Sequence, residues 1–247
     1  MALNAVLSDV HGNLQALEAV FEEIDQLGCD QVYALGDLVG YGARSNECLE
    51  LIKARGVRCL RGNHDREAAA AVGRGDFNEQ AWAAIEYTRG VLTEENRVFL
   101  KSLPETIRIG ADVLMVHGSF DDPDRYIEGP MGAMMTADQL FQIEGAGLCF
   151  FGHTHIPMAA DQGGVLPFYN GEVAWSPGRR LMLNPGSVGQ PRDQSSKASF
   201  LIWDDEAMSF DFKRVAYDVT GAQEDILGAG LPEWLAVRLG RRSFSHS

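Results

Sequence analysis

Apolar runs of strand length alternate with amphipathic helical segments in the N-terminal part of the chain. The runs occupy residues 5–7, 32–35 and 57–60, and apolar side chains recur at helical spacing over 14–27 and about 46–55. Strand, loop and helix units that follow one another predict a parallel sheet with right-handed crossovers. Because ligands of such sheets bind beyond the carboxyl ends of the strands, the loops after these runs are the expected place for chemistry.

A mainly helical stretch follows over about 66–102. Helical segments are expected over 68–72, about 78–92 and 93–100, with Asn and Thr side chains as caps of the last two. The stretch is either an inserted cap over one rim of a site or a set of plain scaffold helices. We expect residues 1–247 to form a single domain that carries this stretch as an insert.

Strand patterns return beyond the helical stretch. A hairpin is expected over 107–116, then a helix over 136–143 and a fully apolar strand over 148–151. Short strands and turns between about 165 and 215 suggest a second, mainly antiparallel sheet. Two helical segments are expected within 220–239.

The composition is that of a globular protein. Hydrophobic residues make up 45% and charged residues 23% of the 247 residues. No apolar run is long enough to span a bilayer, and the N-terminus lacks the positive region of a signal peptide. With 21 Lys and Arg against 35 Asp and Glu, the net charge of −14 argues against stable nucleic-acid binding. A small anionic substrate is compatible with this charge, because bound metal ions invert the local field.

The four cysteines form no C-x-x-C pair. Cys59 and Cys149 lie in apolar runs, which is typical of small core residues. This usage indicates a reducing compartment, and a cytoplasmic protein is the simplest expectation.

Five of the six histidines follow apolar runs and have a glycine close by. Isolated histidines of this kind are usually structural, but five in one kind of loop, together with two aspartates and an asparagine, indicate a metal site. Imidazole and carboxylate suit Mn, Fe, Zn or Ni, whereas a magnesium or calcium site would use oxygen ligands. The candidate ligands are Asp9, His11, Asp37, Asn63, His117, His153 and His155.

This set is too large for one ion and suits two transition-metal ions that share a carboxylate. Two ions about 3.5–4 Å apart clamp both oxygens of an in-line phosphoryl displacement. His64 lies in the same kind of loop but exceeds the ligand count, and a histidine that binds no metal can titrate near neutral pH.

The motifs, taken in order, resemble those of the calcineurin-like metallophosphoesterase superfamily. They are Asp9-x-His11, Gly36-Asp37-x-x-Gly40, Gly62-Asn63-His64-Asp65, His117 after a strand, and Gly152-His153-x-His155. The block 184–193 is similar to one in the small bacterial and archaeal phosphodiesterases of this family. The resemblance implies an α/β fold, a four-layer α/β/β/α sandwich in which two mixed sheets are flanked by helices.

The resemblance also implies roles for the ligands. Asp9, His11, Asp37 and His155 would hold one ion, and Asp37, Asn63, His117 and His153 would hold the other.

The resemblance makes His64 and Asp65 the candidate catalytic residues. His64 would protonate the leaving oxygen or steady the phosphate. Asp65 would either orient His64 or play a supporting or capping role. Substrate contacts are expected from Asn63 and His64, and from Arg192 unless that arginine lies on the surface.

The resemblance fails at one place. Protein serine/threonine phosphatases carry a second Asp and an Arg where this chain has Gly40 and Tyr41. The change argues against phosphoprotein substrates and favours small phosphoesters.

The predicted function is therefore the hydrolysis of small-molecule phosphodiesters or phosphomonoesters by attack of a metal-bridging hydroxide, with a nucleotide as one candidate substrate. One alternative is a dinucleoside polyphosphate hydrolase in which Trp82 or Tyr87 stacks on a base. A non-catalytic scaffold of the same fold is a second alternative, which the intact ligand set disfavours.

Overall fold

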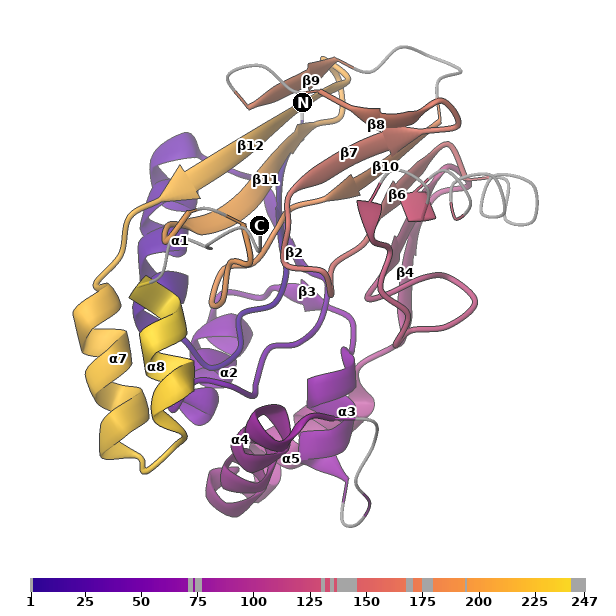
Figure 1. Ribbon diagram of the computed structural model, residues 1–247. Coiled ribbons are helices and arrows are strands. Elements are labelled where there is room, and N and C mark those ends of the chain that lie inside the picture. The colour runs from indigo at the N-terminus through magenta and orange to yellow at the C-terminus, as the bar shows by residue number, and fades with distance from the viewer. Residues whose placement is uncertain are drawn as a thin grey trace.

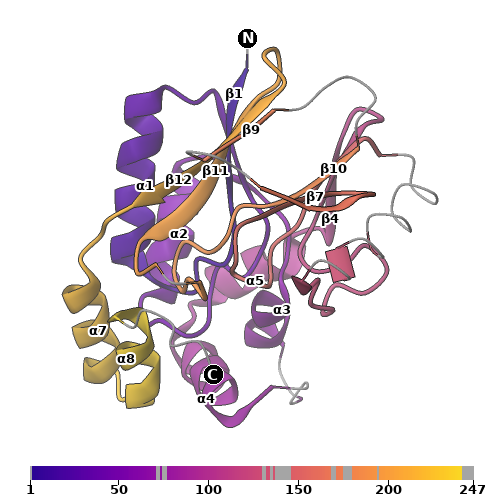
Figure 2. The same cartoon turned by 45° about the horizontal axis from the view of Figure 1, so that its top comes forward.

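The computed structural model describes residues 2–70, 73, 77–129, 132–133, 136, 146–167, 171–174, 180–193 and 195–240. Within these residues two six-stranded sheets pack face to face, and helices flank the sandwich (Figures 1 and 2). This α/β sandwich of two mixed sheets is the architecture that the sequence predicts.

The first sheet contains the three parallel strands expected at the N-terminus. Strand β1 pairs in parallel with β2, and β2 with β3. The other neighbour of β1 is the antiparallel strand β11, which comes from the far end of the chain. In spatial order the sheet consists of β3 (Arg58–Cys59), β2 (Gln31–Ala34), β1 (Leu3–Leu7), β11 (Ala198–Asp204), β12 (Ser209–Val215) and β9 (Glu172–Ala174).

The second sheet mixes both strand directions. The predicted hairpin is present as the antiparallel pair β4–β5, and β5, β6 and β10 run parallel to one another. In spatial order the strands are β4 (Thr106–Ile109), β5 (Val113–Val116), β6 (Leu148–Phe150), β10 (Leu181–Asn184), β7 (Met158–Asp161) and β8 (Gly164–Leu166).

The expectation that the strands after about residue 157 form one antiparallel sheet is therefore wrong. Strands β11 and β12 extend the first sheet, whereas β10 joins the second sheet in parallel with β6. The alternation of apolar and polar residues identifies a strand, but the choice of its partner depends on packing between distant segments.

Alternation along β1 separates two cores. Ala5 and Leu7 point to the core beneath α1 (Leu14–Leu27) and α2 (Ser45–Ala54), and Val6 points to the core between the sheets. Figure 2 shows both helices on the side of the first sheet that faces away from the second. The sheets are thus held together by side chains of alternate strand positions.

Helix α3 (Asn63–Ala69) begins earlier than the expected segment 68–72. The Asp65 carboxylate accepts a hydrogen bond from Gly62 N at 3.0 Å, which starts the helix at the Gly62-Asn63-His64-Asp65 motif itself. The motif therefore forms the first turn of a helix, and residues 71–72 lie outside the described part of the chain.

The caps predicted for the next two helices are confirmed. Asn78 accepts from Ala81 N at the start of α4 (Glu79–Val91), and Thr93 accepts from Asn96 N at the start of α5 (Glu94–Ser102). Helix α5 contributes to the core beneath α1 and α2.

The last described helices are α7 (Val219–Gly228) and α8 (Glu233–Gly240), which pack beside Tyr41 and α4. They confirm the helical segments expected within 220–239. The helix expected over 136–143 lies outside the described residues except for Thr136, and the same holds for the chain beyond Gly240. The four cysteines are free thiols, and three of them are buried.

Candidate metal centre and active site

The loops after β1 and β2 are bonded to each other along their backbones. Asp9 N donates to Gly36 O at 3.1 Å, and His11 N donates to Asp37 O at 2.9 Å. Because parallel strands deliver both loops to the same edge of the sheet, the first two motifs become one structural unit.

Each of the two buried aspartates has one oxygen fixed by a backbone amide. Asp37 Oδ1 accepts from His64 N at 2.9 Å, and Asp9 Oδ2 accepts from His153 N at 3.1 Å. The other oxygen of each carboxylate faces the imidazole nitrogens. The backbone thus orients both carboxylates before any ligand binds.

Backbone carbonyls set the tautomers of three histidines. The Nδ1 atoms of His11, His117 and His155 lie 3.1, 2.7 and 2.7 Å from the carbonyl oxygens of Val39, Leu35 and Gln190. A carbonyl only accepts, so each Nδ1 carries a proton, and each Nε2 is left to face the carboxylates of the cluster.

His153 has the opposite orientation. Its Nε2 donates to the Asp124 carbonyl at 3.0 Å, which leaves Nδ1 buried without a hydrogen-bond partner. Asp9 Oδ1 is likewise buried and has no such partner. Buried polar atoms are rarely left this way, and both atoms belong to predicted ligands.

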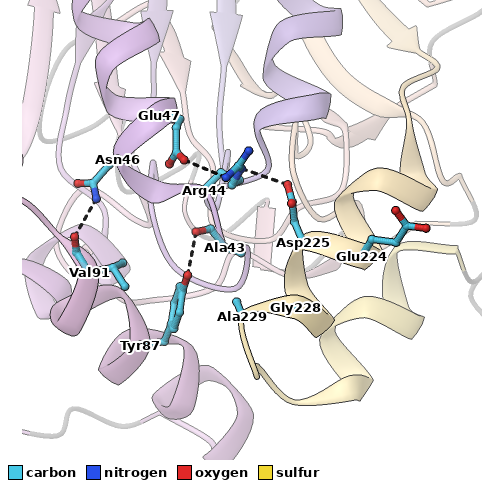
Figure 3. A pocket seen from close by; sticks show the side chains of 10 residues that line it. All are labelled: Ala43, Arg44, Asn46, Glu47, Tyr87, Val91, Glu224, Asp225, Gly228 and Ala229. Atoms are coloured by element: carbon cyan, nitrogen blue, oxygen red, sulfur yellow. Dashed lines mark hydrogen bonds and ion pairs between the residues drawn. The ribbon is translucent and has the colours of Figure 1, made fainter.

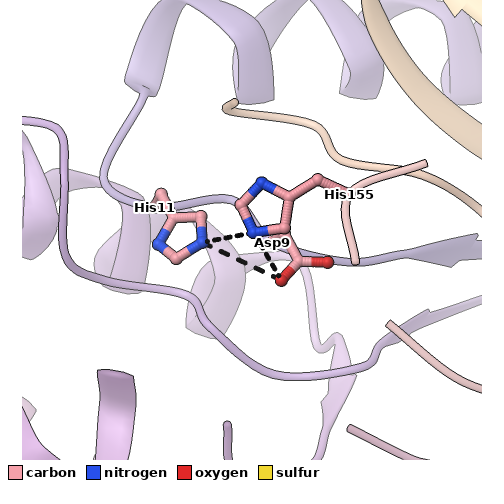
Figure 4. Close-up of side chains that lie close together, drawn as sticks. All are labelled: Asp9, His11 and His155. Carbon is pink, nitrogen blue, oxygen red and sulfur yellow. Dashed lines mark hydrogen bonds and ion pairs between the residues drawn. The ribbon is translucent and has the colours of Figure 1, made fainter. Parts of the chain in front are cut away.

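Asp9, His11 and His155 form the first ligand group (Figure 4). Their side chains point toward one another, with Nε2 of His155 3.3 Å from Asp9 Oδ1 and 3.1 Å from His11 Nε2. Two lone pairs at that distance repel unless a cation or proton lies between them. Ligands about 2.1 Å from a shared ion lie roughly 3–3.5 Å apart, so this group fits a metal ion.

Asp37, His117 and His153 form the second group. Asn63 Oδ1 joins them 3.0 Å from His117 Nε2. Asp37 Oδ2 lies 3.3 Å from His117 Nε2 and 3.6 Å from His11 Nε2, between the two groups. The fold therefore brings all seven predicted ligands into one cluster.

The backbone is strained at this cluster. Seven non-glycine residues of the described chain have positive φ, and all except Met208 lie in the motif loops. The six are Asp9, His11, Asp37, Tyr41, His153 and His155. Left-handed backbone costs energy for such residues, and its concentration here is typical of a functional site.

Burial and charge shift the pKa of these groups in different directions. Burial lowers the pKa of His153 to about 3 and holds that of His11 well below its usual range. Burial also acts to lower the pKa of His117, but the Asp37 carboxylate outweighs it and raises the value to about 10. A metal ion would compete with the proton that His117 and Asp37 share.

His64 lies against this cluster, but none of the described backbone carbonyls binds its Nδ1. The ring packs on His11 and Tyr41, and its Nδ1 is buried without a hydrogen-bond partner. Burial lowers the pKa of His64 to about 4. His11, Asp37 and His64 also meet the spacing of a metal group, so metal content after removal of His64 is the test of its role.

The Asp65 side chain contacts backbone amides, and none of its described hydrogen bonds goes to His64. Its carboxylate accepts from Leu38 N at 2.8 Å, Val39 N at 3.1 Å and Gly62 N at 3.0 Å. These contacts tie the Asp37 loop to the start of α3, and they favour the capping alternative over an orienting one.

Arg192 is partly buried beside the first ligand group. Its backbone N–H donates to His155 O, and its guanidinium donates to the hydroxyls of Tyr126 at 3.3 Å and Tyr41 at 3.4 Å. None of the described ion pairs involves Arg192. A positive charge without a counter-ion next to a metal centre is suited to an anionic substrate.

Residues 184–190 brace the site in a way that the sequence alone does not indicate. Ser187 Oγ donates to Asp9 O and accepts from Gln190 N, both at 2.8 Å. Asn184 Nδ2 donates to Gly152 O at 2.8 Å. The segment therefore joins the loop after β1 in one sheet to the loop after β6 in the other.

A cleft of about 470 Å³ opens beside the ligand cluster. Asn63, His64 and His153 lie on its metal side, and Tyr41, Phe77 and Tyr126 supply aromatic surface. Phe77 directly precedes the Asn78 cap of α4, so the segment that leads into α4 contributes to the wall.

A separate cavity of about 330 Å³ lies between α2, α4 and α7 (Figure 3). Tyr87 lines this cavity, with its hydroxyl 3.3 Å from Ala43 O. The guanidinium of Arg89 covers the Trp82 ring at 4.8 Å. Neither Trp82 nor Tyr87 is among the residues that line the cleft at the metal centre.

The comparisons with known proteins agree with this geometry. Residues 3–207 match the family model of the calcineurin-like phosphoesterase superfamily domain. This chain belongs to that superfamily. It is accordingly a metal-dependent phosphoesterase, and its family generally uses divalent metals.

Two curated relatives cover most of the chain. Uncharacterized protein MJ0912 of Methanocaldococcus jannaschii is 38% identical over 240 residues, which cover 95% of this chain and 96% of the relative. Phosphodiesterase YfcE of Escherichia coli is 26% identical over 216 residues, or 82% of this chain and 87% of the relative.

Among solved structures, a metallophosphoesterase from Sphaerobacter thermophilus superposes with a TM-score of 0.86 at 35% identity, covering 98% of this chain and 99% of the other. Protein PH1004 from Pyrococcus horikoshii has a TM-score of 0.80 at 23% identity, covers 99% of this chain and 100% of the other, and shows the same fold. In the part of the chain that the structure describes, no helix is long and apolar enough to cross a membrane.

Proposed function

We propose that this phosphoesterase hydrolyses small-molecule phosphodiesters or phosphomonoesters at a dinuclear metal centre. The position of Asp37 carries the proposal, because one carboxylate oxygen lies within 3.6 Å of a histidine from each ligand group. Asp9, His11, Asp37 and His155 would hold one ion. Asp37, Asn63, His117 and His153 would hold the other.

The donor set suits Mn, Fe, Zn or Ni. When bound, two such ions supply an activated hydroxide and neutralise charge on the phosphoryl group. The orphaned Asp9 Oδ1 and His153 Nδ1 support this assignment, since an ion would satisfy both atoms.

The chain's own groups would position the substrate. Arg192 would donate to phosphoryl oxygens, because its guanidinium is partly buried and is held in place by the hydroxyls of Tyr41 and Tyr126. His64 would contact the phosphoryl group or the leaving oxygen from the cleft side of the cluster, where its ring is held between His11, Tyr41 and Phe77. Asp65 would act indirectly by holding the Asp37 loop against α3.

A phosphoester panel on metal-loaded protein tests the proposal. Protein loaded in turn with Mn, Ni, Co or Zn is expected to hydrolyse bis-p-nitrophenyl phosphate or p-nitrophenyl phosphate, and the ratio of the two rates separates diesterase from monoesterase. Bound metal without hydrolysis of either ester would support the non-catalytic scaffold and end this proposal.

A dinucleoside polyphosphate hydrolase is the second candidate function. The aromatic lining of the cleft favours it, because each base of such a substrate has a face that stacks. Analysis of the products from a dinucleoside tetraphosphate tests this candidate. Symmetrical or asymmetrical cleavage would support it, and the absence of cleavage would contradict it.

A further inference from the structure

Two aromatic side chains, Tyr126 and Phe77, line the cleft beside the metal centre without belonging to any of the ligand motifs. Tyr126 is in the loop after β5, and Phe77 precedes α4. They reach one cleft of about 470 Å³ from segments that are far apart in the chain. A cleft of this size lies in the range of small-molecule binding sites.

Tyr126 presents a ring that is exposed and yet fixed. The side chain is 43% exposed. Its ring stacks on the imidazole of His153 with centroids 3.9 Å apart and planes 25° apart, and its hydroxyl accepts from Arg192. Because two contacts already hold the ring, the Tyr126 side chain would lose little conformational entropy when a ligand binds to it.

Phe77 presents a second ring next to the reacting region. It meets His64 edge to face, with centroids 5.0 Å apart and an interplanar angle of 86°. The backbone that follows is anchored, since Asn78 caps α4 through Ala81 N at 2.9 Å. Phe77 is therefore placed by α4 rather than by the metal loops.

The charged residues Arg66, Asp122 and Asp124 at this cleft already have hydrogen-bond partners. The Arg66 guanidinium pairs with the Asp124 carboxylate through contacts of 3.0 and 2.6 Å. The Asp122 carboxylate accepts from Asp124 N at 3.0 Å. The aromatic surface is consequently the main unused recognition element on this side of the metal centre.

We infer that this cleft is a subsite for a flat aromatic group of the phosphoester, which stacks on Tyr126 and meets the ring of Phe77. The inference rests on the proposed hydrolysis of small phosphoesters and adds a substrate class, the esters of aromatic or heterocyclic alcohols, nucleosides included. Aliphatic esters offer no π face and would fill the subsite poorly.

The test compares two ligands that share an anion. Calorimetry on the metal-loaded protein measures the affinities for phenylphosphonate and ethylphosphonate. The ratio of these two affinities reports how much the aromatic ring contributes to binding. Stacking predicts that phenylphosphonate binds about tenfold more tightly. Tyr126→Leu and Phe77→Leu should each bring the ratio toward one, whereas Tyr126→Phe should preserve it because the ring remains.

Trp234→Leu is the matched control, because Trp234 is also 43% exposed but lies on α8 and does not line the cleft. A ratio near one in the unmodified protein, or an unchanged ratio in both leucine variants, would overturn the subsite. Hydrolysis of bis-p-nitrophenyl phosphate by the same preparations reports separately on the proposed function. A ratio near one in unmodified protein that still hydrolyses this ester contradicts the subsite alone.

Discussion

A bidentate ion pair joins Arg66 of α3 to Asp124 in the loop after β5, with Nη1–Oδ1 and Nη2–Oδ2 distances of 3.0 and 2.6 Å. The two partners come from segments that hold different members of the second ligand group. Helix α3 begins with Asn63 and His64, and the carbonyl of Asp124 accepts from the ring of His153. The pair therefore fixes one side of the catalytic cleft relative to the other.

We predict that Asp124→Asn lowers kcat/KM several-fold with little loss of stability. An exposed ion pair stabilises a protein by only about 0.2–1 kcal/mol, whereas a small misplacement of groups in an active site slows turnover by much more. Asp25→Asn is the matched control, because Asp25 forms an equally short bidentate pair with Arg55 away from the site. Equal effects of the two variants on kcat/KM would contradict the positioning role.

Metal stoichiometry should depend on which ligand is removed. Asp37→Ala is expected to lose both ions, because its carboxylate lies between the two groups, and Asp9→Ala is expected to lose only the ion of the first group. His64→Ala should keep both ions while turnover falls. Elemental analysis of the purified variants gives the ions per chain. Loss of an ion from His64→Ala would make this histidine a ligand and refute its assigned role.

Gly40 is expected to matter for the position of the His64 ring. A Cβ atom at Gly40 would collide with His64 Nδ1. Gly40 also has a φ of 97°, so alanine would add about 1–2 kcal/mol of backbone strain. Gly40→Ala should therefore lower kcat while the metals stay bound.

Gly56→Ala separates the two effects. Gly56 also has positive φ, 63°, but a Cβ atom there meets nothing within 4 Å. The Gly56→Ala variant should therefore have a lower melting temperature and an unchanged kcat. A similar loss of kcat in both variants would show that strain, rather than contact with His64, slows the reaction.

Arg192→Gln should weaken substrate binding. A hydrogen bond to a charged group contributes about 1.5–3 kcal/mol, so we expect the KM to rise roughly 10- to 100-fold. Arg214→Gln is the control, because the described contacts of Arg214 are with Asp193 and Lys197, whereas those of Arg192 are with two tyrosines that line the cleft. An unchanged KM in Arg192→Gln would show that Arg192 has a structural role and does not bind the substrate.

The candidate ligands could be proposed from the sequence because their signal is local. A strand that ends at a glycine followed by Asp37 or His153 indicates where the backbone leaves the sheet and which donor side chain follows. The helix caps at Asn78 and Thr93 were predictable for the same reason, since each bond spans only three residues. The resemblance to the family then assigns these candidates to the two proposed ions.

The sequence by itself determined which side chains reach the carboxyl ends of the strands and that their chemistry suits metal ions. Only the tertiary structure decided that β10 pairs with β6, that Asp65 caps α3, and that Tyr126 rather than Tyr87 lines the cleft. The physical reason is the separation along the chain of the residues that interact. Dihedral preference and donor chemistry belong to neighbouring residues, whereas strand pairing, tautomers and cleft walls depend on packing between residues far apart in the chain.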